Sequence, residues 1–146
     1  MKKIKIIVLL IMTMMMLADC KKDLDLEADV WYGVREFLLS KNCDTKCGIP
    51  APAEENTVRL EGFIDEFYMM EETRNFYVFD QNNDNFSINV EVDSVISNVI
   101  FTRIKNSQSK NAKIKGIIKG FDKPTNFNCE RGFYLVLKYE SDFIIE

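Results

Sequence analysis

The alternation of apolar and polar residues limits the fold of this 146-residue chain more than any other feature. Apolar and polar side chains alternate over residues 58–65, 86–92 and 112–121. Successive side chains of a β-strand point to opposite faces, so this alternation predicts strands that bury one face and expose the other. The inward positions, which we expect to form the core, are Val58, Leu60, Ile64, Ile88, Val90, Ile114, Ile118, Leu135 and Leu137.

Two more strands and one helix complete the predicted order of elements. Residues 76–79 form a short apolar strand, and 132–139 form the last long strand. The segment 95–106 lies between the third and fourth strands and has the periodicity of a helix. Its apolar residues at helical spacing are Ile96, Val99, Ile100 and Ile104.

This order over residues 57–146 resembles the OB-fold, a five-stranded Greek-key barrel with a helix between its third and fourth strands. The resemblance is carried by VRLEGFID, NFYVFD, FSINVEV, AKIKGIIKGFD and GFYLVLKYE. Gly62 and Gly116 lie in mid-strand, where a small barrel must bend sharply. The pattern is similar to the tRNA-anticodon-binding subtype of OB domain that is found in exported bacterial lipoproteins. The expected fold class is therefore mainly β, with an α-helix before the barrel.

The segment before the barrel, residues 20–56, is predicted to hold that N-terminal helix and a linker. Apolar residues recur at helical spacing through 24–40, and acidic residues crowd the first half, where the helix dipole favours them. Gly48 and the prolines that follow it predict the end of the helix. Trp31 and Phe37 are expected to pack against the barrel.

The start of the chain has the layout of a bacterial export signal, which we assign to residues 1–19. Met1–Lys5 is cationic, and 6–17 is apolar and uncharged but shorter than the roughly 20 residues that a membrane-spanning helix needs. Leu17-Ala18-Asp19-Cys20 then resembles the lipobox of bacterial lipoproteins, although Asp19 stands where Gly, Ala or Ser is usual.

The lipobox resemblance implies that Cys20 is the mature N-terminus. Its thiol would carry diacylglycerol, and its amino group could carry a fatty acid such as palmitate. Two or more acyl chains hold a protein stably on a membrane. The expected location is the cell envelope, at the outer membrane, facing either the periplasm or the surface. A plain secretory signal that is cut nearby and an uncleaved anchor are the alternatives.

Three cysteines follow Cys20, namely Cys43, Cys47 and Cys129. An exported protein meets an oxidising compartment, so a disulfide is expected. We predict a bridge between Cys47 and Cys129, with Cys43 as the second choice of partner for Cys129, because both ends then lie in loop sequence. The cysteines also allow a short Cys43–Cys47 ring or a fully reduced chain.

The chain has no histidine and is acidic, and both facts limit its chemistry. Ser-His-Asp catalysis, Cys-His catalysis and His-ligated metal sites are excluded. Without residues 1–19 the formal charge is about −6, which disfavours non-specific nucleic-acid binding. Residues 80–85 with Glu91 imitate a calcium loop, but strand-like flanks predict a hairpin turn there. We expect no catalysis, no metal and no cofactor.

The candidate ligand-binding residues are aromatic and basic side chains on the predicted strands. They are Tyr77, Phe79 and Tyr134, with Lys113 and Lys115 on one strand face. Nucleic-acid-binding OB-folds combine such residues in a groove, whereas a solvated outer face is the alternative interpretation of the lysines. We therefore expect a lipid-anchored, exported binding module of unknown ligand. Its partners would be a membrane, through the N-terminal lipid, and a ligand that is a protein, an oligosaccharide or an oligonucleotide. The last two would use the face of strands two and three.

Overall fold

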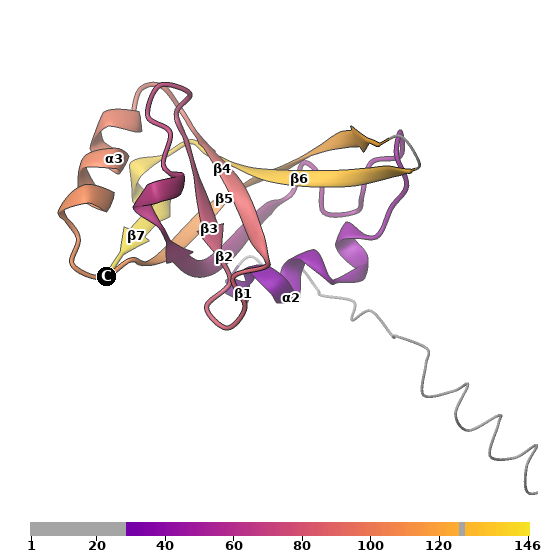
Figure 1. The fold of residues 1–146 in the computed structure, drawn as a ribbon, viewed down its shortest axis with the longest axis horizontal. Helices are drawn as coiled ribbons and strands as arrows, with labels where there is room; N and C mark the ends of the chain where they lie inside the picture. The colour runs from indigo at the N-terminus through magenta and orange to yellow at the C-terminus, as the bar shows by residue number, and fades with distance from the viewer. Residues whose placement is uncertain (1–28, 126–127) are drawn as a thin grey trace, which may run out of the picture.

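The computed structural model describes residues 29–125 and 128–146, which form a mixed β-sheet with two α-helices (Figure 1). The predicted signal peptide, Cys20 and the first part of the predicted N-terminal helix lie outside the described residues. The strands and helices are β1 (Tyr32–Gly33), α2 (Val34–Leu38), β2 (Thr57–Ile64), β3 (Asn75–Phe79), β4 (Ser87–Val92), α3 (Ser97–Asn106), β5 (Asn111–Pro124), β6 (Cys129–Leu137) and β7 (Phe143–Ile145). Single 3₁₀ turns lie at η1 (Lys41–Cys43), η2 (Glu66–Tyr68) and η3 (Glu140–Asp142).

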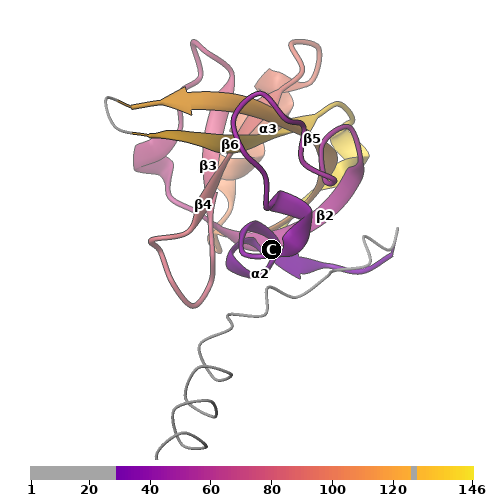
Figure 2. The same cartoon turned by 90° about the vertical axis from the view of Figure 1, so that its right-hand side faces the viewer.

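The long strands pair around a ring, so the prediction of a mainly β fold is confirmed (Figures 1 and 2). β2, β3 and β4 are antiparallel in succession, and β4 then pairs in parallel with β6. β6 pairs antiparallel with β5, and β5 returns to β2. The ring is unevenly closed, because β2 meets β5 along most of its length but meets β3 only at Phe63–Phe79 and Ile64–Val78.

The predicted count of five strands is not confirmed, because the sheet has seven. β1 pairs in parallel with Leu60 and Glu61 of β2, and β7 pairs antiparallel with residues 112–114 of β5. One edge of β5 pairs with β2. The other edge pairs with β6 only from Ile117 onward, so β7 pairs with the earlier part of that edge, which β6 leaves open. Both added strands are too short to show a period in the sequence.

The core lies inside the ring and matches the predicted interior. Every predicted interior residue is buried, with at most 3% of its surface exposed. The predicted helix at 95–106 is present as α3, and its Ile100, Phe101 and Ile104 are buried against the sheet. The ring of Phe76 meets those of Phe101 and Phe143 edge to face, which joins β3, α3 and β7.

Two mid-strand glycines let neighbouring strands come close. A Cβ at Gly62 would overlap the carbonyl oxygen of Phe79, and one at Gly116 would lie 2.6 Å from the carbonyl oxygen of Val136. Both glycines therefore stand where β2 and β5 approach β3 and β6 too closely for a side chain to fit.

The predicted helix over 24–40 is not confirmed at that length, because only Val34–Leu38 is helical among its described residues. Tyr32 and Gly33 extend along β2 instead. The helix begins where a tertiary partner can cap it, because the carboxylate of Asp80 accepts a hydrogen bond from the backbone N–H of Arg35 at 2.9 Å. Asp80 also accepts from Asn82, which confirms that its segment forms a turn between β3 and β4.

The segment between α2 and β2 is joined to the long β5–β6 hairpin by a disulfide and by hydrogen bonds. Cys47 and Cys129 are bridged, with their Cα atoms 5.7 Å apart, which confirms the first of the predicted pairings. Arg131 donates to Glu54 at 2.6 and 2.8 Å and to Asp122 at 2.8 Å. The hydrogen bonds from Arg131 hold the pKa of Glu54 below its usual value, and the backbone N–H of Gly48, then Arg131, lower the pKa of Asp122.

Candidate functional site

The structure places the five predicted ligand-binding residues in two regions of the outer surface. Tyr77 and Phe79 lie on the outer face of β3, and Tyr134 is in the same row as Tyr77, with Asn89 of β4 between them. Lys113 and Lys115 lie on the first half of β5, opposite Glu61 and Arg59 of β2. The single aromatic and basic groove that the sequence predicts is therefore divided into an aromatic region and a basic region.

The aromatic region is larger than the sequence indicates. Five rings form what we call the aromatic face, namely Phe63 of β2, Phe67 and Tyr68 of η2, and Tyr77 and Phe79 of β3. Phe63 stacks on Phe79 with centroids 5.4 Å apart, and Tyr68 lies 5.3 Å from Phe79. Phe67 meets Tyr68 edge to face at 5.2 Å. The rings thus form one continuous apolar surface outside the core.

Local sequence explains why these rings point outward. Alternation sends Ile64 and Phe76 into the core and leaves Phe63 and Tyr77 on the other side of their strands. The turn η2 is fixed by Asp65, whose carboxylate accepts from the backbone N–H of Phe67 at 2.9 Å. This turn carries Phe67 and Tyr68 out to exposures of 84% and 44%. A contiguous exposed apolar cluster of this kind is typical of a binding surface.

The border of the aromatic face is polar and mostly uncharged. Asn89 lies opposite Tyr77, Ser87 opposite Phe79 and Asn111 opposite Phe63. The nearby Glu66 is paired with Lys110 at 2.5 Å. Within the described part of the chain, the cation–π contacts involve the rings of Phe86 and Trp31 and none of the five rings of this face. The face therefore offers flat apolar rings with amide and hydroxyl groups beside them.

A groove of about 630 Å³ adjoins the aromatic face at Tyr77. It opens where β4 and β6 part, since the two strands pair only from Asn89 and Tyr134 onward. Leu38, Leu39 and Cys43 of the N-terminal segment line one wall. The turn before β4 and the strands β4, β5 and β6 line the rest of the groove with apolar, polar and charged side chains, namely Asn85, Phe86, Ser87, Asn89, Phe121, Lys123, Glu130, Arg131 and Phe133. The charge of Arg131 is already paired with Glu54 and Asp122, so the groove is close to neutral.

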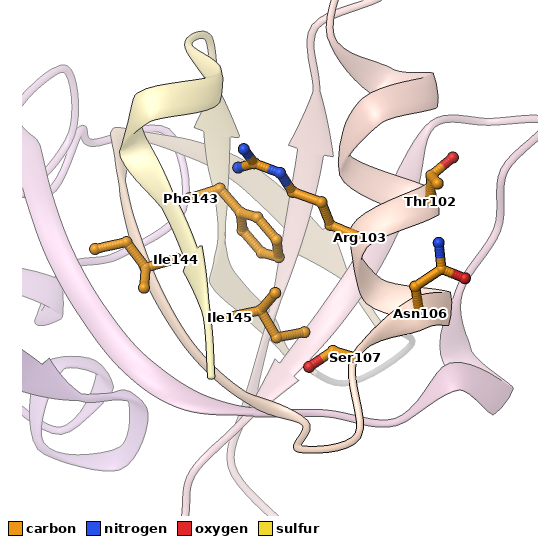
Figure 3. A pocket seen from close by; sticks show the side chains of 7 residues that line it. All are labelled: Thr102, Arg103, Asn106, Ser107, Phe143, Ile144 and Ile145. Atoms are coloured by element: carbon orange, nitrogen blue, oxygen red, sulfur yellow. The ribbon is translucent and has the colours of Figure 1, made fainter.

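A second hollow of about 530 Å³ lies between α3 and β7 (Figure 3). Phe143 and Ile145 point toward α3, while Ile144 points to the opposite side of β7. Arg103 on the wall of this hollow is paired with Glu140 at 2.7 Å. Its other polar lining groups are the hydroxyls and amide of Thr102, Asn106 and Ser107, which do not form a nucleophile and base pair.

The described residues show neither a cluster of metal ligands nor a membrane-spanning helix. Residues 29–125 and 128–146 contain no group of three or more His, Cys, Asp or Glu side chains placed to hold a metal ion. The same residues contain no helix of the length and apolar character that crossing a membrane would require.

No known family model matches the chain, and a search of curated proteins finds no match. Function is therefore inferred from the residues of this chain and their geometry.

Proposed function

We propose that the chain is a lipid-anchored, exported binding module without catalytic activity, and that its ligand contacts the aromatic face. The observation that carries this proposal is the set of five touching rings outside the core, two of which are more than 40% exposed. Burying such rings against a ligand removes a large apolar area from water. While the rings are exposed to water, this favourable free energy of burial is not realised, and binding of a ligand would realise it.

The strand order supports an OB-fold interpretation of this surface. In the ring β2–β3–β4–β6–β5, with α3 before β5, β3 and β4 stand where strands two and three of an OB barrel stand. The face of those two strands, with the loops that flank it, is the ligand surface of OB-folds. The aromatic face and the groove beside Asn89 occupy this position, although β1 and β7 go beyond the five-stranded pattern.

The export part of the proposal is supported by the cysteines. The lipobox-like Leu17–Cys20 follows an apolar run, and the Cys47–Cys129 bridge joins segments 82 residues apart. Structural disulfides of this kind persist in oxidising compartments such as the periplasm and the cell surface. A location at the outer membrane, on its periplasmic or surface side, is consistent with both features.

Between an oligosaccharide and an oligonucleotide, the residues around the rings favour the oligosaccharide. A nucleic acid requires Lys and Arg to neutralise its phosphates, but Lys110 is already paired with Glu66 and the chain is acidic overall. A neutral sugar offers C–H groups that pack on ring faces and hydroxyls that bond amides such as Asn89. Phe67 and Tyr68, on an exposed turn, offer two ring surfaces against which the C–H groups of a sugar can pack.

The test is a glycan array probed with the purified protein, with single-stranded DNA and RNA measured in parallel. Burying an aromatic side chain contributes roughly 1.5–3 kcal/mol, so Phe67→Ala and Tyr68→Ala should each weaken glycan binding about tenfold or more. Tyr139→Ala is the matched control, because Tyr139 is an aromatic residue that is 65% exposed outside this face. Glycan binding that Phe67→Ala and Tyr68→Ala leave unchanged would refute the proposed face, and tight salt-dependent binding of single strands would favour the oligonucleotide.

A further inference from the structure

A second surface, on the outer side of β2 and β5 next to β1, combines the only tryptophan of the chain with three cations. The guanidinium of Arg59 lies 5.5 Å from the ring centroid of Trp31, and the ammonium of Lys113 lies 5.9 Å from it. Lys115 stands directly opposite Arg59 across the β2–β5 ladder. We call Trp31, Arg59, Lys113 and Lys115 the Trp31 face.

A small hollow of about 190 Å³ lies in the Trp31 face. Trp31, Arg59, Lys115 and Ser141 line it, together with Asp142 and Ile144. Guanidinium, ammonium and hydroxyl donors around one hollow are the groups that bind a phosphate. Figure 3 shows that Ile144 points away from α3, and 48% of its surface is exposed, so an apolar side chain borders these donors.

The cations of this face are only partly satisfied within the described residues. Arg59 pairs with Asp29 at 3.0 Å, but the side chain of Asp29 is 90% exposed, and the buried Nε of Arg59 has no hydrogen-bond partner. Lys115 is 3.6 Å from Asp142, and Lys113 forms no ion pair with a described residue, although Glu61 lies opposite it in the ladder. Like charges directly opposite on neighbouring strands repel, so an anion between Arg59 and Lys115 would relieve that repulsion.

We infer that the Trp31 face docks on the membrane that holds the lipid anchor, with the phosphate of an anionic phospholipid in the hollow. This inference rests on the proposed function for the anchor itself. Eight residues separate Cys20 from Asp29, and a chain of that length spans at most about 30 Å. The described structure begins beside this face, since Asp29 contacts Arg59. The tether therefore keeps the Trp31 face within reach of the headgroups.

The side chains fit that position for physical reasons. Tryptophan is enriched at the level of the headgroups, where its ring is in apolar surroundings and its N–H is in polar ones. Basic residues near an anionic leaflet are attracted over about one Debye length. Ile144, which is 48% exposed and lines the hollow, adds apolar surface next to the phosphate-binding groups.

The test uses the full chain as the cell processes it, reconstituted in vesicles of brominated phosphatidylcholine with or without brominated phosphatidylglycerol. Trp31 is the sole tryptophan, so quenching of tryptophan fluorescence by bromine reports the distance of this face from the lipid. We expect strong quenching with phosphatidylglycerol that is lost in about 1 M salt, where the Debye length falls to about 3 Å. Co-sedimentation with the vesicles reports the anchor separately.

The decisive variant is Lys113→Gln with Lys115→Gln. Each basic residue at an anionic surface contributes roughly a factor of five, so the ratio of docked to undocked molecules should fall about thirtyfold. The matched control is Lys119→Gln with Lys123→Gln, which makes the same change of charge farther along β5 and should leave the quenching unchanged.

Equal quenching in both kinds of vesicle, or an equal loss in the two double variants, would overturn the inference. Quenching that 10 mM inorganic phosphate abolishes would assign the hollow to a soluble anion and would also overturn the membrane as its occupant. If the chain does not co-sediment, the anchor is refuted. In that case the vesicles are titrated into the soluble protein and into Lys113→Gln with Lys115→Gln, and the quenching is recorded at each lipid concentration. Quenching that does not rise with the concentration of lipid overturns the docking.

Discussion

Breaking the Cys47–Cys129 bridge should remove a large part of the stability of the domain. The bridge joins residues 82 positions apart, and the loop-entropy relation gives about 4.5 kcal/mol at 25 °C for a loop of that length. Small domains are stable by only about 5–15 kcal/mol, so this loss brings the protein near the limit of folding. The disulfide acts mainly by restricting the unfolded chain, which would otherwise sample many more arrangements of the N-terminal segment.

The assay is urea unfolding of the double variant Cys47→Ser and Cys129→Ser, made in a Cys43→Ser background so that no thiol can re-pair. With an m-value of about 1.5 kcal/mol/M, the midpoint should fall by about 3 M urea. Reduction of the Cys43→Ser protein with dithiothreitol should give the same midpoint as the triple variant. A fall of less than about 0.5 M would contradict the reasoning, because packing and the Arg131 network would then hold the segment without the bridge.

Three further predictions concern the core, the strand contacts and the response to acid. Ile88→Ala should cost about 2–5 kcal/mol in a denaturant titration, because Ile88 is 1% exposed, and a cost near zero would show that the faces of β4 are reversed. Gly116→Ala should lower the melting temperature, because its Cβ would lie 2.6 Å from a carbonyl oxygen of β6, and an unchanged melting temperature would show that the strands can separate. The lowered pKa of Glu54 contributes stability above pH 4.5 that is lost as the pH falls through its folded value. Glu54→Gln should therefore flatten the acid limb of the stability curve below about pH 5, and an unaltered limb would assign the acid sensitivity to other carboxyl groups.

The strands of the ring could be predicted from sequence because their burial is one-sided. Each inward residue of β4 or β5 is apolar and most of its neighbours are polar or charged, so a period of two is visible without knowledge of the partners. The same reasoning located α3 and the turn at Asp80, where the residue types fix the local backbone. These features depend on neighbours in the chain, and so one sequence is enough to find them.

The N-terminal segment and the aromatic face depend on contacts between distant residues, and here the sequence was insufficient. The spacing of apolar residues over 24–40 predicts one long helix, but Tyr32 pairs with Leu60 and Asp80 caps α2 at Arg35. Neither of these contacts between distant residues can be seen in the spacing. Phe67 and Tyr68 lie in a turn, where residue type does not tell whether a ring is buried or exposed. Phe63 did carry a signal, because the alternation of β2 places it outside the core.

Export and acylation at Cys20 are the premise of the proposed function and of the membrane-docked orientation. Mass spectrometry of the N-terminal peptide, taken from protein in the membrane fraction, tests that premise most directly. We expect a peptide that begins at Cys20 and carries the mass of diacylglycerol, with a further fatty acid where the amine is acylated. A membrane-free protein that retains residues 1–19, or a peptide with an unmodified Cys20 thiol, would contradict it.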